Sequence, residues 1–182
     1  SPFVELPAIP IGNTYGGFTN AVMINQHEFI IAPTQQWSGN HLYKYNTKTN
    51  EWDRKWKRFR YCDDITFDCE TQQIYTIARS SLLIYNLKES NWKEHNHGMR
   101  LSVANAFAEA GSIIIDSKLH VLGGLHNASY LIWDSNNNKF KEISKIPQSR
   151  TGFRSFGLTH VRSQQKLFIF GGINQDTKAS QS

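Results

Sequence analysis

Short apolar runs rich in Ile, Val, Phe and Tyr recur along this chain, and polar segments containing Gly, Pro, Asn or Ser separate them. Residues of these types favour strands, and no stretch keeps the period of about 3.6 residues that marks an amphipathic helix. The pattern predicts short β-strands throughout the chain. It also predicts loop rather than helix for the segment 100–111, RLSVANAFAEAG.

The strand ends repeat at nearly constant intervals. Four copies align at intervals of 46, 45 and 48 residues: EFIIAP (28–33), IYTIAR (74–79), LHVLGG (119–124) and LFIFGG (167–172). Downstream of the first three copies, two aromatic residues lie seven positions apart: Tyr45 and Trp52, Tyr85 and Trp92, and Trp133 and Phe140. Two periodic features in phase with one another indicate a repeat architecture.

Each repeat contains four short strands. First strands are predicted at 20–25, 64–69, 112–117 and 156–161, the aligned copies are the second strands, and third strands are predicted at 41–46, 81–86 and 129–134. Fourth strands begin at the second aromatic residue of each pair, after the polar turns TKTN, LKES and SNNN. Four antiparallel strands in about 45 residues make one propeller blade. The fold class is therefore predicted to be all-β, a β-propeller with three complete blades plus partial ones.

The N-terminal segment FVELPAIP (3–10) matches FKEISKIP (140–147) at a uniform offset of 137 residues, which predicts an orphan outer strand. The chain is interpreted as a single repeat region over 1–182, with three blades and a half blade: 20–57, 64–95, 112–146 and 156–172. We expect further blades C-terminal to Ser182 or, because a cut ring exposes strand edges, self-association.

These residues resemble the kelch repeat, whose signature is an apolar strand ending in Gly-Gly, then a Tyr, then a Trp about seven residues later. LHVLGG carries the glycines with Trp133 and Phe140, and the copies at 28–33 and 74–79 keep the Tyr and Trp without the glycines. The resemblance implies a propeller whose loop face binds peptides or proteins. Its members include ubiquitin-ligase substrate receptors and actin-associated or scaffolding proteins.

The glycines and aromatic residues are interpreted as structural. Glycine has no Cβ, so at a strand end it permits a sharp exit and the close approach of a neighbouring blade. The Tyr and Trp rings are expected to fill the space between blades, where each buries about 150–250 Å². They are therefore not assigned as ligand contacts.

The sequence offers little catalytic chemistry. It contains no Gly-rich phosphate loop, no His-Glu-x-x-His and no Gly-x-Ser-x-Gly. The segment HNH (95–97) is interpreted as a solvated loop rather than a metal site. No catalytic, cofactor-binding or metal-binding residue is assigned, and the chain is predicted not to be an enzyme. The alternative is a propeller-fold enzyme, galactose-oxidase-like or sugar-processing. A galactose-oxidase-like enzyme, by the family resemblance, would need a Tyr/His copper site, and none is assigned.

The loops after second strands and the links between blades are expected on the same face, because the strands of a blade run alternately up and down. That face would carry seven candidate partner-binding residues: Trp37, Arg58, Arg60, Arg100, His126, Arg150 and Arg154. Arginine binds carboxylates bidentately and, with Trp, is enriched at interface centres. The expected partner is therefore a protein or peptide, with acidic character, and the alternative is a solvated basic surface with no specific role. Nucleic acid is not expected, because no stacking motif accompanies the arginines.

Composition, with 39% hydrophobic and 19% charged residues, indicates a folded rather than a disordered chain. The net charge of +5 favours an acidic partner, and it is also an ordinary charge for solubility. There is no apolar run long enough to span a membrane, so no membrane association is expected. Cys62 and Cys69 fit a reducing compartment, and no signal sequence is visible, so we expect a cytoplasmic location.

Overall fold

Antiparallel β-strands dominate the part of the chain that the computed structural model describes, which comprises residues 7, 18–33, 42–53, 62, 64–78, 81–97, 107, 109–146 and 152–174. Within these residues the one helical element is a 3-10 turn at Arg162–Gln164, and no helix there is long and apolar enough to cross a membrane. The chain divides into two units, Ser1–Cys62 and Asp63–Ser182. The fold class is that of a β-propeller, as predicted.

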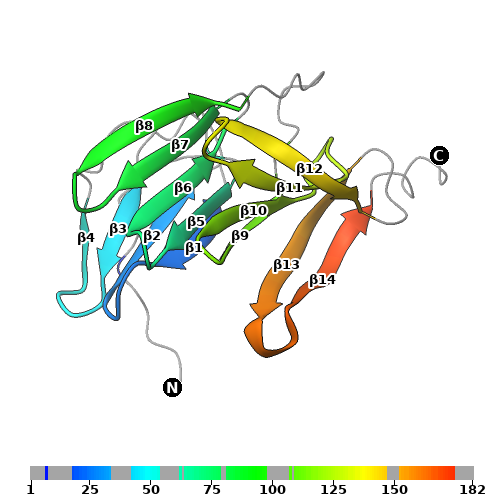
Figure 1. Cartoon of the computed structure of the whole chain (residues 1–182). Coiled ribbons are helices and arrows are strands. Elements are labelled where there is room, and N and C mark those ends of the chain that lie inside the picture. Colours follow the sequence, from blue (N-terminus) through cyan, green and yellow to red (C-terminus); the bar gives the residue numbers. More distant parts are fainter. Residues whose placement is uncertain are drawn as a thin grey trace. The chain divides into compact units, whose positions relative to one another are not determined.

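The strands form three four-stranded sheets and one two-stranded sheet, each in simple sequence order (Figure 1). The first unit holds β1 (Phe18–Met23), β2 (Glu28–Pro33), β3 (Tyr43–Asn46) and β4 (Glu51–Asp53). The second unit begins with β5 (Asp64–Asp68), β6 (Gln73–Ile77), β7 (Ser81–Asn86) and β8 (Asn91–Asn96). It continues with β9 (Gly111–Ile115), β10 (Lys118–Leu122), β11 (Ser129–Asp134) and β12 (Lys139–Lys145), and then β13 (Phe153–Val161) and β14 (Lys166–Asn174). Three complete blades and one half blade are therefore confirmed.

The predicted aromatic pairs are direct cross-strand neighbours. The register pairs Tyr45 with Trp52, and the ring centroids lie 4.8 Å apart. The corresponding pairs on β7–β8 and β11–β12 are also in register, with centroids 4.8 Å and 5.2 Å apart. A four-residue turn joins the two strands each time, so residues seven apart in sequence lie opposite one another.

The same turn chemistry recurs in all three hairpins. The side-chain oxygen of Asn46, the last residue of β3, accepts hydrogen bonds from the backbone N–H groups of Lys48 and Thr49. Asn86 and Asp134 do the same in their hairpins. The fourth turn residue has a positive φ in every case: 62° at Asn50, 53° at Ser90 and 50° at Asn138. Asn and Asp both favour such turns, and Asn tolerates the left-handed region.

The core of the second unit lies between successive sheets. Buried residues of β6 and β7, including Ile77 and Leu82, form one cluster with Leu119, Leu131 and Trp133 of the next sheet. The first strands of the sheets are neighbours, since β9 contacts both β5 and β13. This confirms that Trp133 fills space between blades. Each Å² of apolar surface that this cluster removes from water stabilises the fold by about 25 cal/mol.

Gly123 and Gly124 allow the loop after β10 to touch the adjacent sheet. Gly123 has φ 63°, and a Cβ there would lie 2.1 Å from the carbonyl oxygen of Phe153. The N–H of Gly124 donates to that same carbonyl over 2.6 Å. The predicted close approach of a neighbouring blade is therefore confirmed at these glycines.

Gly123→Ala should destabilise the second unit by about 2–3 kcal/mol or more, because the new methyl group collides with backbone and φ is positive. Gly157→Ala is the matched control: its Cβ would meet only ordinary contacts at 3.8 and 3.9 Å. That change should lie within about 1 kcal/mol of the wild type. Urea unfolding measures both, and equal losses would contradict the packing described for Gly123.

Trp133→Ala should cost about 3–5 kcal/mol, because the ring is only 6% exposed and lies within the core cluster. Ile143→Ala on β12, where the side chain is 45% exposed, should cost less than about 1 kcal/mol. Denaturant midpoints of the two variants test the strand register. The reverse order would mean that the wrong face of the β11–β12 hairpin had been assigned to the core.

Candidate functional site

Two of the seven predicted partner-binding residues, His126 and Arg154, fall within the described residues. The other five lie outside them: Trp37, Arg58, Arg60, Arg100 and Arg150. His126 is exposed in the β10–β11 loop, and Arg154 lies on β13 with its side chain 21% exposed. Both belong to the second unit.

Backbone and amide hydrogen bonds hold the loop that carries His126. The Asn127 side chain donates to the carbonyl of Gly123 over 2.8 Å and accepts from the N–H of Ser129 over 3.2 Å. The N–H of Gly123 also donates to the Ser129 carbonyl, which closes the loop at its base. Asn127 is buried while His126 points to solvent. The loop therefore presents an exposed imidazole on an ordered backbone.

The His126 loop packs against the start of β13, where the link between two blades ends. The N–H of Phe153 donates to the Asn127 carbonyl over 3.4 Å, and a Cβ on Gly152 would lie 2.3 Å from the Leu125 carbonyl oxygen. A loop after a second strand and an inter-blade link therefore do lie together here, as the alternating strand directions predict. We call the exposed surface of 123–128, Glu109 and Arg154 the loop face.

Arg154 is engaged within the protein. Its Nη1 lies 2.5 Å from Oε1 of Glu109, which belongs to the link before β9. The ion pair joins the link before β9 to the start of β13, and a partner carboxylate would have to compete with Glu109 for this guanidinium. The sequence analysis did not predict Glu109 as part of this surface, because its segment, AFAEAG, contains no recognised motif.

A polar pocket of about 380 Å³ lies in the second unit among the turns that join first and second strands. Its lining includes Glu70, Asp116, His120, Tyr130, His160 and Arg162. The sequence analysis missed this pocket, because these residues come from three strands and three turns and show no common spacing. The only signal was that His120 interrupts the otherwise apolar run LHVL.

His120 is largely buried and paired in this pocket. Its Nδ1 lies 2.5 Å from the Tyr130 hydroxyl, and the two rings stack with centroids 5.7 Å apart. Burial lowers the pKa of His120 below its ordinary value of 6.5, partly offset by a hydrogen bond to the Ile115 backbone. The nearby His160 lowers that pKa further. His120 is therefore neutral at pH 7 and engaged with Tyr130.

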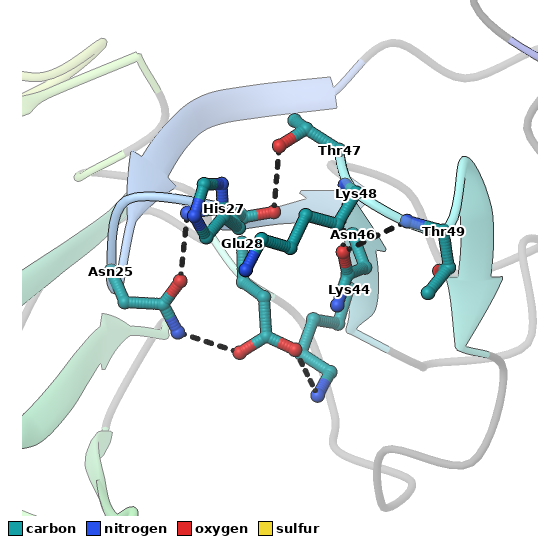
Figure 2. Close-up of polar contacts among 8 residues, drawn as sticks. All are labelled: Asn25, His27, Glu28, Lys44, Asn46, Thr47, Lys48 and Thr49. Carbon is teal, nitrogen blue, oxygen red and sulfur yellow. Dashed lines mark hydrogen bonds and ion pairs between the residues drawn. The ribbon is translucent and has the colours of Figure 1, made fainter.

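A second polar cluster lies in the first unit around Glu28 (Figure 2). Oε1 of Glu28 lies 2.8 Å from Nζ of Lys44, and Oε2 accepts from the Asn25 side chain over 2.7 Å. The Lys44 hydrogen bond is the main cause that lowers the pKa of Glu28. Both carboxylate oxygens are thus occupied by neighbours from β3 and the β1–β2 turn. The cluster supports this sheet rather than offering a vacant carboxylate.

The segment 95–97 is not a solvated loop, so that interpretation is corrected. His95 lies on β8 against the Trp133 ring, and His97 is 1% exposed. The His97 ring packs edge-on against Phe107, with centroids 5.6 Å apart, and its Nε2 lies 3.3 Å from the Ala78 carbonyl. Across the described part of the chain, no group of three or more His, Cys, Asp or Glu side chains is placed to hold a metal ion.

Solved structures share this fold at low sequence identity. The extracellular domain of BT4673 from B. thetaiotaomicron matches with a TM-score of 0.58 and 14% identity, over 86% of this chain and 21% of that one. The extracellular domain of BT3049, a hybrid two-component system of the same organism, matches with a TM-score of 0.55 and 10% identity, over 90% of this chain and 24% of that one. The structure of U3-55K matches with a TM-score of 0.56 and 10% identity, over 90% of this chain and 56% of that one. No family model matches the sequence, and neither does any curated protein.

These matches establish the fold and nothing about chemistry, because every identity is below 25%. The chain spans about a fifth to a quarter of the length of the two bacterial domains, and 56% of U3-55K. The TM-scores exceed 0.5 for each. The relatives therefore support the propeller architecture that the repeats predict.

His97 should make stability depend on pH. Burial lowers its pKa below 6.5 in the folded protein, so the unfolded chain binds a proton that the folded chain does not. Stability should be full above about pH 7 and should fall as the pH drops through 6.5 towards the folded-state pKa. His97→Gln should lose less stability than the wild type between pH 7.5 and 5.5, as measured by urea midpoints. An unchanged pH slope would contradict the burial of His97.

Proposed function

We propose that this chain is a non-catalytic, kelch-type interaction module that binds a protein or peptide with acidic character through its loop face. The ordered His126 loop is the observation that carries the proposal. Buried Asn127 and the backbone bonds around it fix the loop, while His126 is left exposed. A loop already held in one conformation loses little entropy when a partner binds.

The charge of the chain supports an acidic partner. Lysines and arginines outnumber acidic residues by 20 to 15. Five of the predicted contact residues are arginines, which bind carboxylates through two parallel hydrogen bonds. In our proposal Arg154 holds the start of β13 to the link before β9 through Glu109, and Arg100 and Arg150, which belong to the links of the same unit, extend the loop face and contact the partner directly. The proposal assigns the chain no cofactor and no reaction, and it places the protein in the cytoplasm.

Charge reversal tests the proposed face. The double variant Arg100→Glu/Arg150→Glu should weaken binding of a fluorescent Asp/Glu-rich peptide at least about tenfold, measured by anisotropy at constant salt. The control Lys48→Glu/Lys88→Glu removes the same charge from exposed hairpin turns at the other ends of the strands. It should leave affinity within about twofold, since screened charges far from the site contribute little.

His126→Ala should also weaken peptide binding while unfolding at the same urea midpoint as the wild type, because the side chain is exposed. Equal losses from the loop-face and hairpin-turn reversals would leave only non-specific charge attraction. No binding by the wild type would contradict an acidic partner.

A further inference from the structure

The polar pocket around His120 lies where three turns of the second unit come together. These turns join β5 to β6, β9 to β10 and β13 to β14, at residues 69–72, 116–117 and 162–165. They are neighbours because β9 contacts both β5 and β13. All three turns belong wholly to the described part of the chain, and the pocket among them has a volume of about 380 Å³.

Negative and positive groups reach this pocket from different turns. Glu70 and Asp116 line it from the first two turns, and Arg162 lines it from the third. The Ser117 hydroxyl donates a hydrogen bond to Oε2 of Glu70 over 2.6 Å, which ties the two acidic turns together. His160, near the end of β13, adds an imidazole from the same hairpin as Arg162. The carboxylates therefore come from one pair of turns and the guanidinium from the neighbouring hairpin.

These charged groups do not satisfy one another. Among the described residues, the Asp116 carboxylate and the Arg162 guanidinium form no hydrogen bond or ion pair, and Oε1 of Glu70 has no hydrogen-bond partner. Glu28 differs, because both of its carboxylate oxygens are occupied, and so does Arg154, which forms an ion pair. Opposite charges that line one cavity without meeting suit a ligand that carries both charges.

The rest of the lining is uncharged and partly apolar. His120 is 7% exposed and is engaged with the half-buried Tyr130, so this pair of rings adds no charge at pH 7. Ile115 and Leu167 contribute apolar side chains to the same cavity. Apolar side chains favour contact with methylene groups over contact with the hydroxyl groups of a sugar. The chemistry therefore fits a short aliphatic chain with opposite charges at its two ends.

We propose that this pocket binds a small zwitterion in which a short aliphatic chain joins an ammonium group to a carboxylate. The ammonium group donates hydrogen bonds to the carboxylates of Asp116 and Glu70, and the ligand carboxylate accepts from the guanidinium of Arg162. Free amino acids with the amine and the carboxylate at opposite ends have this chemistry. The site lies at turns between first and second strands, so it is separate from the loop face and does not depend on the proposed function.

A series of amino acids provides the probe and measures the separation of the two charges. It runs from glycine through β-alanine and γ-aminobutyrate to ε-aminocaproate, so the methylene chain lengthens while the charged ends stay the same. NMR chemical shifts of the backbone amides at 115–117 and 160–165 report binding to the isotope-labelled chain. One length should bind at least about tenfold more tightly than both butylamine and butyrate, which each carry only one of the two charges.

Two variants assign the two ends of the ligand. Arg162→Gln should weaken binding of the best amino acid at least about tenfold and should not weaken binding of butylamine. Asp116→Asn should weaken binding of the same amino acid and should not weaken binding of butyrate. Asparagine suits this turn, because Asp116 and Ser117 both have positive φ. A loss of structure would not give this crossed result, since it would weaken the binding of every ligand.

Matched controls remove the same charges outside the pocket. Lys88→Gln and Glu89→Gln lie in the β7–β8 turn, and neither side chain lines the cavity. Both variants should bind the amino acid within about twofold of the wild type, because exposed charges far from a site are screened. Urea midpoints of all four variants should match that of the wild type, since all four side chains are exposed.

Three results would overturn the proposal. The first is that no member of the series binds more tightly than butylamine and butyrate. The second is that Arg162→Gln or Asp116→Asn keeps the wild-type affinity for the best amino acid. The third is that sorbitol shifts the same amides with equal affinity, which would indicate a site for polyols instead.

Discussion

The hairpin between the third and fourth strands of each blade constrains the rest of the structure. A side-chain oxygen of Asn46, Asn86 or Asp134 captures the backbone of a four-residue turn whose last member has positive φ. This geometry sets residues seven apart opposite one another and so fixes the aromatic pairs. Side chains alternate along a strand, so a slip of one residue would turn each ring to the other face. The turn therefore decides which residues build the core between sheets.

Packing between sheets then determines where loops can serve as a binding surface. In the second unit, Gly123 and Gly152 let the His126 loop and the start of β13 approach until their backbones bond. The Arg154–Glu109 ion pair connects the start of β13 to the link before β9. The polar pocket around His120 lies instead among the turns between first and second strands. The same blade architecture thus offers two chemically different surfaces.

The sequence predicted the local structure well, because the repeats report it directly. The third strands β7 and β11 were predicted at their observed bounds, and the aromatic spacing gave the hairpin register. Features that depend on distant residues were not predictable. β13 begins at Phe153, earlier than expected, because that residue bonds to the glycine loop of another sheet. His97 is buried only because Phe107 and Phe140 pack against it, and neither is near it in sequence.

Proton–proton NOEs between the aromatic rings test the central claim most directly, because they report the register of each hairpin in solution. The account predicts ring-to-ring NOEs for Tyr45 with Trp52, Tyr85 with Trp92, and Trp133 with Phe140, whose centroids lie 4.8 to 5.2 Å apart. A register one residue away would place Trp92 opposite Ile84 or Asn86. NOEs from the Trp92 indole to the Ile84 methyl groups, with none to the Tyr85 ring, would contradict the hairpin register described above.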